Sequence, residues 1–231
     1  MSKVHLKSLD WWWPIYRKIA SSLGINPKKD EIATIEASKH LLSYGFDFFE
    51  NVLRAENLLR GKTVAVVGAH ESFLNQRIEG DVIIASDGAY NGLVLYKDIL
   101  PEIVVTDFDG VSLKLLSRHK PLVFAHVHGD NILEYLRSAP NIINQLVPTT
   151  QAFPYFPFYN FGGFTDGDRA VAIAMALGAR KVKVYGFKRD SIGKFSGKTR
   201  APIKRKKLEI AYEIIEVLRN IHGTEVVIIE D

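Results

Sequence analysis

Short runs of apolar, mostly β-branched residues recur along most of this chain, and segments with the periodicity of amphipathic helices separate them. The runs span residues 63–67, 82–85, 103–106, 122–125, 142–146, 182–185 and 226–229. The segments that fit helices are 88–97, 130–137, 167–178 and 203–221. Continuous apolar strands that alternate with helices are typical of a parallel sheet covered on both faces. The sequence therefore predicts an α/β fold: a Rossmann-like, open, mostly parallel sheet with helices on both faces.

The first 60 residues have helical rather than strand periodicity. A first helix is expected around Trp12, and Gly24 ends it. A longer helix is expected over residues 29–59, with Gly45 as the point where it could be interrupted. Its expected inward side chains are Ile32, Ile35, Leu42, Phe46, Phe49, Leu53 and Leu58. We therefore predict an N-terminal helical extension, residues 1–60, and an α/β nucleotide-binding catalytic domain, residues 61–231.

Three consecutive tryptophans, Trp11–Trp13, lie in this extension. A stacking platform for a flat heterocycle is one interpretation of such a triplet. We favour packing, because buried aromatic side chains dominate contacts between parts of a protein. The triplet is therefore expected to anchor the extension to the α/β domain.

The composition excludes several classes of protein. The chain has no cysteine, so disulfides and thiolate metal sites are excluded, and any metal must bind carboxylates or the seven histidines. No apolar run approaches the roughly 20 residues that a membrane helix needs. The N-terminus also lacks the apolar stretch of a signal peptide. We expect a cytoplasmic protein without membrane association, either a monomer or a homo-oligomer.

Positive charge is concentrated in one segment of the chain. The segment from Arg180 to Lys207 contains twelve Lys or Arg and one Asp, whereas the whole chain has a net charge of only +4. Such a segment indicates a polyanionic partner, either nucleotide phosphates or nucleic acid. A solvated basic surface is the alternative interpretation.

Polar or glycine-rich residues follow five of the apolar runs, at the positions where open parallel sheets bind ligands. Asp107 and Asp109 follow run 103–106, and their i, i+2 spacing lets both carboxylates face one cation. Asp87 follows run 82–85. Mg²⁺ prefers carboxylates together with substrate phosphates, so we predict these three aspartates as its ligands. Turn formation and helix capping are the alternative roles.

Two glycine-containing turns are candidates for nucleotide contact. Gly88, directly after Asp87, opens a predicted helix whose free N–H groups favour an anion. The turn with Gly68 and Ser72 follows the first run but lacks the spacing of a dinucleotide fingerprint. The stretch 193–199 resembles a phosphate-binding loop but is one residue too short.

A histidine-rich turn, residues 126–131, follows another of the apolar runs. His126 and His128 share one side of an extended chain, and Asp130 and Asn131 lie beside them. These side chains suit contact with phosphate or a base, or general acid–base chemistry. A zinc site is an alternative, but no further set of ligands is evident.

The stretch before the helix at 167–178 combines glycines with oxygen donors. Two glycines allow backbone to approach a ligand, and three side chains present oxygens, more than one helix cap requires. The candidates are Gly162, Gly163, Thr165, Asp166 and Asp168.

Basic side chains follow the run at 182–185 and continue beyond it. Lys188 and Arg189 are expected at the same sheet edge as the aspartates. Lys198 and Arg200 lie on a Gly-containing loop that we expect to be mobile and to close over a triphosphate.

Together, these motifs resemble the archaeal 6-hydroxymethyl-7,8-dihydropterin pyrophosphokinases of the methanopterin pathway. The residues that carry the resemblance are the runs GAHESF, IIASDGA, PEIVVTDFDG, HVHGDN, NFGGFTDGDRA and VYGF, together with Trp12, Tyr16 and Ile19 near the N-terminus. The resemblance covers nearly the whole chain. The catalytic part is similar to the thiamine pyrophosphokinases, with Thr106 where those enzymes have glycine.

The resemblance implies transfer of diphosphate from ATP to the hydroxymethyl group of a reduced pterin, with release of AMP. Mg²⁺ would be the metal, and no nucleic acid would be bound as the main role. It implies a catalytic set comprising Asp107, Asp109, His126, His128 and Asp130. The sequence leaves open which residue, if any, is a general base.

Two other functions compete with this interpretation. Asp107 and Asp109 also fit the nucleophile motif of haloacid-dehalogenase-type phosphatases, although two predicted strands precede them here. A nucleic-acid-binding module that uses the basic segment is the second alternative. It does not explain the acidic strand ends, which would repel a phosphate backbone.

Overall fold

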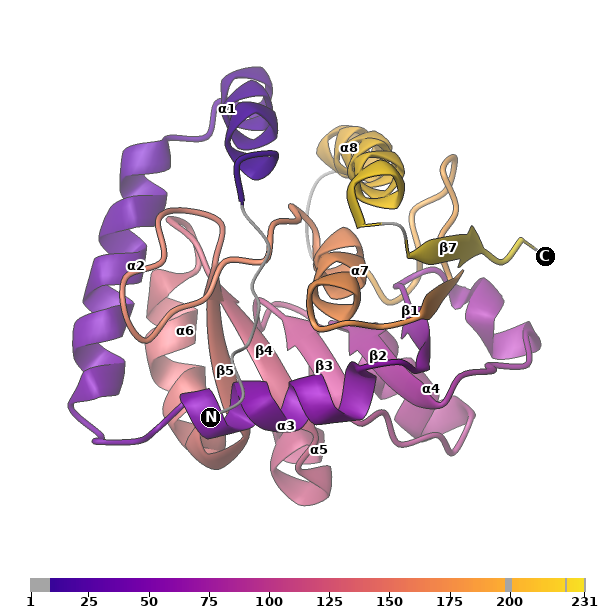
Figure 1. Ribbon diagram of the computed structural model, residues 1–231, viewed down its shortest axis with the longest axis horizontal. Helices are drawn as coiled ribbons and strands as arrows, with labels where there is room; N and C mark the ends of the chain where they lie inside the picture. The colour runs from indigo at the N-terminus through magenta and orange to yellow at the C-terminus, as the bar shows by residue number, and fades with distance from the viewer. Residues whose placement is uncertain (1–8, 198–200, 223, 231) are drawn as a thin grey trace.

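The computed structural model describes residues 9–197, 201–222 and 224–230. Within these residues one sheet of seven strands has the order β5-β4-β3-β2-β1-β6-β7, and every neighbouring pair is parallel (Figure 1). The strands are β1 (Thr63–Val67), β2 (Val82–Ser86), β3 (Ile103–Thr106), β4 (Leu122–Val127), β5 (Leu146–Thr150), β6 (Lys181–Tyr185) and β7 (Glu225–Ile228). The predicted α/β class and the parallel sheet are confirmed.

Helices cover both faces of this sheet, as its continuous apolar strands require. On one face α1, α3, α7 and α8 pack against side chains such as Val64 and Val66. On the other face α2, α4, α5 and α6 pack against side chains such as Ala65 and Val67. The α-helices are α1 (Trp12–Leu23), α2 (Pro27–Leu42), α3 (Phe49–Leu59), α4 (Ala89–Tyr96), α5 (Leu113–His119), α6 (Ile132–Ser138), α7 (Asp166–Ala176) and α8 (Ala201–His222), and the 3₁₀ helices are η1 (Glu71–Asn75) and η2 (Ala139–Gln145).

The predicted long helix at 29–59 is two helices, α2 and α3. The chain breaks near Gly45, whose φ of 63° is in the left-handed region that favours glycine. The expected inward set was partly wrong, because Ile32, Leu42 and Phe49 are exposed, at 50%, 48% and 41%. Small side chains such as Ala33 and Ala37 face the core instead, and they let the α2 backbone lie close to its neighbours.

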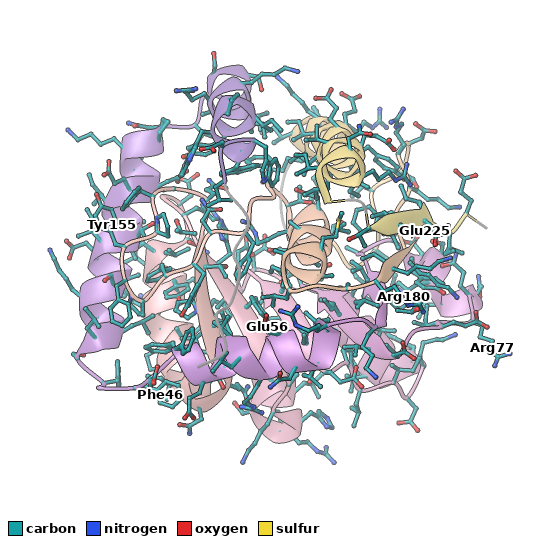
Figure 2. All side chains as sticks on the ribbon, in the orientation of Figure 1. Phe46, Glu56, Arg77, Tyr155, Arg180 and Glu225 are labelled. Atoms are coloured by element: carbon teal, nitrogen blue, oxygen red, sulfur yellow. The ribbon has the colours of Figure 1, made fainter. Side chains whose placement is uncertain are left out.

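The N-terminal helices share the core of the sheet. Trp12 is fully buried, and its indole Nε1 donates to the backbone oxygen of Gln151 at 3.0 Å. Its ring stacks on Tyr16, with centroids 5.8 Å apart. The packing role predicted for the tryptophan triplet is confirmed for Trp12. A loop near β5 also contacts α2, where Tyr155 donates to Glu31 at 2.7 Å (Figure 2).

One predicted strand was misplaced. Residues 142–146 mostly belong to η2, and the strand of this region is β5, which begins only at Leu146. Pro148 weakens the strand pattern of β5, but proline is tolerated there because β5 is at the edge of the sheet. Helix α5 was not predicted. No helix in the described part of the chain is long and apolar enough to cross a membrane.

Candidate active site

A cavity of about 500 Å³ opens at the carboxyl ends of the strands. Residues that follow β1 to β6 line it, as the rule for open parallel sheets predicts. Among the predicted site residues, Gly68, Asp87, Asp107, Asp109, His126, His128, Asp130, Thr165, Asp166 and Lys188 line this cavity. The fold therefore brings predicted site residues from distant parts of the sequence into one cavity.

The cavity includes the point where the strand order reverses. The chain runs from β1 through β2, β3 and β4 to β5 at one edge of the sheet, and then crosses back to place β6 on the other side of β1. β1 therefore lies between β2 and β6. The turns after β1 and β6 meet there, and the His70 N–H donates to the oxygen of Gly186 at 3.0 Å. A Cβ on Gly68 would lie 2.3 Å from the ring of Phe187, so this contact requires glycine.

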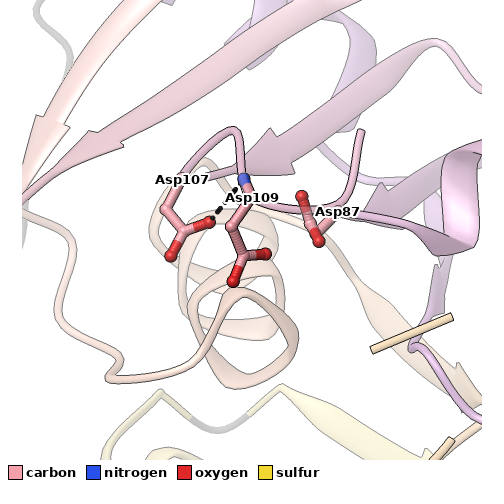
Figure 3. A group of neighbouring side chains, drawn as sticks. All are labelled: Asp87, Asp107 and Asp109. Carbon is pink, nitrogen blue, oxygen red and sulfur yellow. Dashed lines mark hydrogen bonds between the residues drawn. The ribbon is translucent and has the colours of Figure 1, made fainter. Parts of the chain in front are cut away.

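Three carboxylates converge at the ends of β2 and β3 (Figure 3). Asp87, Asp107 and Asp109 each offer an oxygen, and these oxygens lie within 4.8 Å of one another. The Thr106 hydroxyl donates to Asp87 Oδ1 at 2.7 Å, and the Gly110 N–H donates to the same oxygen at 3.2 Å. The Asp109 N–H donates to Asp107 Oδ1 at 3.1 Å. Local backbone and side-chain bonds thus hold the trio in place.

The trio is electrostatically strained without a cation. Burial raises the pKa of Asp87 to about 8, and the charges of Asp107 and Asp109 add to the rise. Burial and the charge of Asp107 also raise the pKa of Asp109. Burial alone would raise the pKa of Asp107, but contact with His128 holds it below its ordinary value. Three oxygens at this spacing, with mutual repulsion to relieve, fit a divalent cation.

The two histidines after β4 have different surroundings. His128 Nε2 is 3.6 Å from Asp107 Oδ2, so this ring reaches the acidic trio. His126 is only 2% exposed, and burial lowers the pKa of its imidazole well below the ordinary value. Asn131 does not line the cavity; its side chain donates to the backbone oxygens of His126 and Asp107 at 2.8 and 3.0 Å. It joins the two turns that carry the site, and its predicted contact with the ligand stays a prediction.

The segment before α7 divides into ligand-facing and structural residues. Thr165 and Asp166 line the cavity, and burial raises the pKa of Asp166 well above its ordinary value. Asp168 is fully buried, and its carboxylate accepts from the N–H groups of Phe164 and Thr165 at 2.6 and 2.8 Å. Asp168 therefore caps α7, and the prediction that it presents an oxygen to the ligand is not supported.

Glycine has a packing role at two predicted positions. Gly162 and Gly163 have φ of 79° and 89°, in the left-handed region. A Cβ on Gly162 would lie 2.5 Å from the ring of Trp11, and one on Gly163 would lie 2.5 Å from the Cα of Arg169. Neither glycine lines the cavity.

Two further turn residues also lie behind the cavity wall rather than in it. The Ser72 N–H donates to His70 Nδ1 at 3.1 Å, and a Cβ on Gly88 would lie 2.2 Å from the oxygen of Phe195. Direct ligand contact, predicted for both Ser72 and Gly88, has no geometric support.

Part of the basic segment lines the same cavity as the carboxylates, and we call these residues the lysine wall. Lys188, Lys204 and Lys207 line the cavity. The charge of Lys207 favours the ionised form of both Asp107 and Asp109, although burial and the charge of Asp107 leave the pKa of Asp109 raised. Arg189 is exposed and lies over the ring of Tyr212, 4.9 Å from its centroid, so it does not share this position. The predicted contacts of Lys198 and Arg200 fall outside the described residues.

The loop before α8 is fixed against the turn that follows β1. Ser191 Oγ and His70 Nε2 are 2.8 Å apart, and the Lys194 N–H donates to Glu71 at 2.7 Å. A Cβ on Gly197 would lie 2.1 Å from Asp109 Oδ1, so the loop passes directly over the trio.

Several cavity residues were not predicted. Lys204 and Lys207 lie in the basic segment that the sequence singled out, but helical spacing alone did not select them. Leu23, Asp30 and Gln151 belong to parts of the chain that were assigned no ligand role. Asp30 and Gln151 meet only in the folded chain, where Gln151 Nε2 donates to Asp30 Oδ2 at 2.6 Å.

Comparison with known proteins points to one family. A family model described as "6-hydroxymethylpterin diphosphokinase MptE-like" matches residues 39–188. Proteins named 6-hydroxymethyl-7,8-dihydropterin pyrophosphokinase from Pyrococcus furiosus and Methanothermobacter thermautotrophicus are 34% and 32% identical to this chain. Each match covers 90% of this chain and 93% of the relative. A protein of the same name from Methanocaldococcus jannaschii is 28% identical, over 90% of this chain and 95% of its own length.

Proposed function

The chain belongs to the MptE-like family of 6-hydroxymethylpterin diphosphokinases, and from that premise we propose that it transfers diphosphate from ATP to the hydroxymethyl group of 6-hydroxymethyl-7,8-dihydropterin. The hydroxymethyl oxygen attacks the β-phosphorus of ATP, the bond from that phosphorus to the α,β-bridging oxygen breaks, and AMP leaves. The hydroxyl proton is released, and the products are AMP and the pterin diphosphate. The family match confirms the resemblance that was identified from the sequence.

One observation carries this proposal: an acidic trio and three lysines line a single cavity. Phosphoryl transfer requires positioning and neutralisation of charge more than covalent catalysis by the protein. An acidic cluster alone would repel ATP, and lysines alone would bind phosphate without activating it. The pair is suited to a phosphate chain held together with a divalent cation.

Mg²⁺ is the cofactor that fits this donor set. Asp87, Asp107 and Asp109 would hold it, since hard carboxylate oxygens are its preferred protein ligands. When bound, it would neutralise the charge of the phosphate oxygens. The protein's own residues then do the positioning.

The lysine wall is suited to holding the phosphates. Lys188 follows β6, and Lys204 and Lys207 project from the first turns of α8 into the same cavity. Lys204 is half-buried and its amine donates to the backbone oxygen of Gly197, and this burial lowers the pKa of the amine. A cation in such a position interacts more strongly with a phosphate than one on the open surface.

His128 is the residue best placed to orient the acceptor hydroxyl. Its ring lines the cavity and its Nε2 lies 3.6 Å from Asp107 Oδ2, at the edge of the trio. A hydroxymethyl group bound there would lie next to phosphates held by the trio. Asp130 lines the same side and is the second candidate.

The experiment that tests the function follows the nucleotide product. The protein, ATP, Mg²⁺ and the reduced hydroxymethylpterin should give AMP in proportion to the acceptor. The matched control is 6-methyl-7,8-dihydropterin, which lacks the attacking hydroxyl and should give no AMP. ADP as the sole nucleotide product would contradict the proposal.

The same assay separates the two competing functions. A dehalogenase-type phosphatase would form a phosphoenzyme on Asp107 and release inorganic phosphate without an acceptor. A nucleic-acid-binding module would bind in a strongly salt-dependent way and would produce no AMP.

A further inference from the structure

One end of the cavity is lined by residues that belong to neither the trio nor the lysine wall, although the charge of Asp107 acts on its Arg169. It is lined by residues from the turn between α1 and α2, from α2 itself, from the ends of β4 and β5, and from the first turn of α7. We call this the helical end of the cavity; its residues are Leu23, Ile25, Asp30, His126, Gln151 and Arg169. It joins the N-terminal helices to the catalytic sheet.

Two buried polar side chains at the helical end each have one nitrogen without a hydrogen-bond partner, although Arg169 Nη2 donates to the backbone oxygen of Phe164 at 3.2 Å. His126 and Arg169 are each only 2% exposed. The Nε2 of His126 and the Nε of Arg169 have no partner with good hydrogen-bond geometry. Burial lowers the pKa of His126, and a weak hydrogen bond with the side chain of Gln151 opposes that shift only slightly. Buried polar atoms are nearly always paired in native proteins, so unpaired ones in residues that line a cavity point to a ligand.

The hydrogen bonds around His126 indicate whether its Nε2 is a hydrogen-bond donor or an acceptor. The Thr149 hydroxyl donates to the oxygen of Ala125 at 3.1 Å, so its single proton is already used. Thr149 Oγ1 can then only accept from His126 Nδ1, which is 3.4 Å away. In the neutral imidazole the other nitrogen, Nε2, is consequently an acceptor. It should receive an N–H or O–H from the ligand, whereas Arg169 can only donate.

A buried carboxylate fixes the neighbouring amide. Asp30 is 2% exposed and accepts from Tyr16 Oη, Gln151 Nε2 and the Gly129 N–H at 2.6, 2.6 and 2.7 Å. A carboxylate accepts only from the nitrogen of the Gln151 amide, so its oxygen is on the other side. The helical end therefore offers both acceptors and donors beside the apolar side chains of Leu23 and Ile25. This mixture suits the polar edge of a flat heterocycle.

The sheet order decides which of the two substrates this edge belongs to. His126 and Gln151 follow β4 and β5, the trio follows β2 and β3, and the Gly68 and Gly186 turns follow β1 and β6. The trio thus lies between the helical end and the strand-reversal point. In phosphoryl transfer the attacking and leaving oxygens lie roughly in line on opposite sides of the phosphorus. The acceptor and the AMP portion of ATP should accordingly occupy opposite ends of the cavity.

We propose that the helical end binds the ring of the acceptor, with His126 Nε2 receiving an N–H of the ring and the Arg169 guanidinium donating to an acceptor atom on it. This inference rests on the proposed function and adds where and how the acceptor is recognised. It also gives the N-terminal helices a direct part in substrate choice, because Leu23, Ile25 and Asp30 come from them.

The test measures binding of the two substrates separately. Reduced hydroxymethylpterin is titrated without ATP by its fluorescence, and MgATP is titrated alone by calorimetry. His126→Leu should weaken pterin binding roughly tenfold or more, because the ring's N–H then loses its partner in a buried site. His126→Gln, which retains an acceptor, should restore part of this loss. MgATP affinity should stay within about twofold in both variants.

A matched control and a second variant keep the test decisive. His119 lies at the end of α5, near the amino end of β4, whereas the cavity lies at the carboxyl ends of the strands. His119→Leu should therefore leave both affinities unchanged. Arg169→Met should also weaken pterin binding, with thermal melting used to verify that the fold persists.

Loss of MgATP binding with unchanged pterin binding would assign the helical end to adenine and overturn the inference. Unchanged pterin binding in both His126→Leu and Arg169→Met would overturn it as well. A wild-type protein that binds MgATP but no reduced pterin would instead refute the proposed function itself.

Discussion

Asp87→Asn should stabilise the metal-free protein while abolishing its activity. Asp87 is 6% exposed, and its pKa is about 8 against an ordinary 3.8, so across that window the folded protein holds a proton that the unfolded chain releases. The raised pKa therefore lowers the free energy of unfolding. This loss of stability is absent below the ordinary pKa and grows by about 1.4 kcal/mol per pH unit up to the folded pKa. At pH 7 it is on the order of 4 kcal/mol. Asparagine mimics the protonated acid, and its oxygen can still accept from Thr106 and Gly110.

The assay is urea denaturation of both proteins in a chelator at several pH values. At pH 7 we expect the variant to be about 2–4 kcal/mol more stable than the wild type, and the difference should disappear near pH 4. Added Mg²⁺ should stabilise only the wild type, because ligand binding to the native state raises stability. A variant that is less stable by the same amount at every pH would refute the reasoning, since Asp87 would then contribute to folding as a carboxylate. Mg²⁺ affinity of the wild type should rise from pH 6 to pH 9 as Asp87 loses its proton.

Further predictions concern the trio and the lysine wall. Asp107→Asn and Asp109→Asn should each reduce turnover at least about tenfold with no loss of fold, measured as AMP formation and far-ultraviolet circular dichroism. Lys204→Ala should raise the KM for ATP several-fold and leave the KM for the pterin unchanged, whereas the control Arg205→Ala, at an exposed position, should change neither KM. Equal effects of the two substitutions would indicate that the basic segment is only a solvated surface. Gly197→Ala should lower activity without lowering the melting temperature much, because its Cβ would press on the Asp109 carboxylate; wild-type kinetics in this variant would show that the loop can shift freely.

Much of the sheet could be predicted from the sequence because its strands are apolar throughout. The bounds predicted for β1 and β3 match the structure, since both strands lie inside the sheet and need apolar side chains on both faces. Strand β5 was misplaced because an edge strand tolerates Pro148 and polar residues. The break between α2 and α3 lies near Gly45, the position named from the sequence as a possible interruption, but helical periodicity alone still favoured one long helix.

The acidic part of the candidate site was also predictable. Aspartates directly after neighbouring parallel strands must lie at one edge, which brought Asp87 next to Asp107 and Asp109. The helical end was not predictable, because Asp30 reaches the cavity only through the tertiary packing of α2. Asp168 was given a ligand role because a capping residue and a ligand residue look alike until their hydrogen bonds are seen.

The most direct test of the central claim is the fate of the acceptor oxygen and of the nucleotide in one reaction. Reduced hydroxymethylpterin labelled with ¹⁸O in its hydroxyl is incubated with the protein, Mg²⁺ and ATP, and all products are weighed by mass spectrometry. Transfer by attack of that hydroxyl on the β-phosphorus predicts a pterin that carries a diphosphate and retains the label, with one unlabelled AMP for each. A pterin monophosphate with ADP, or label lost from the pterin product, would contradict the account.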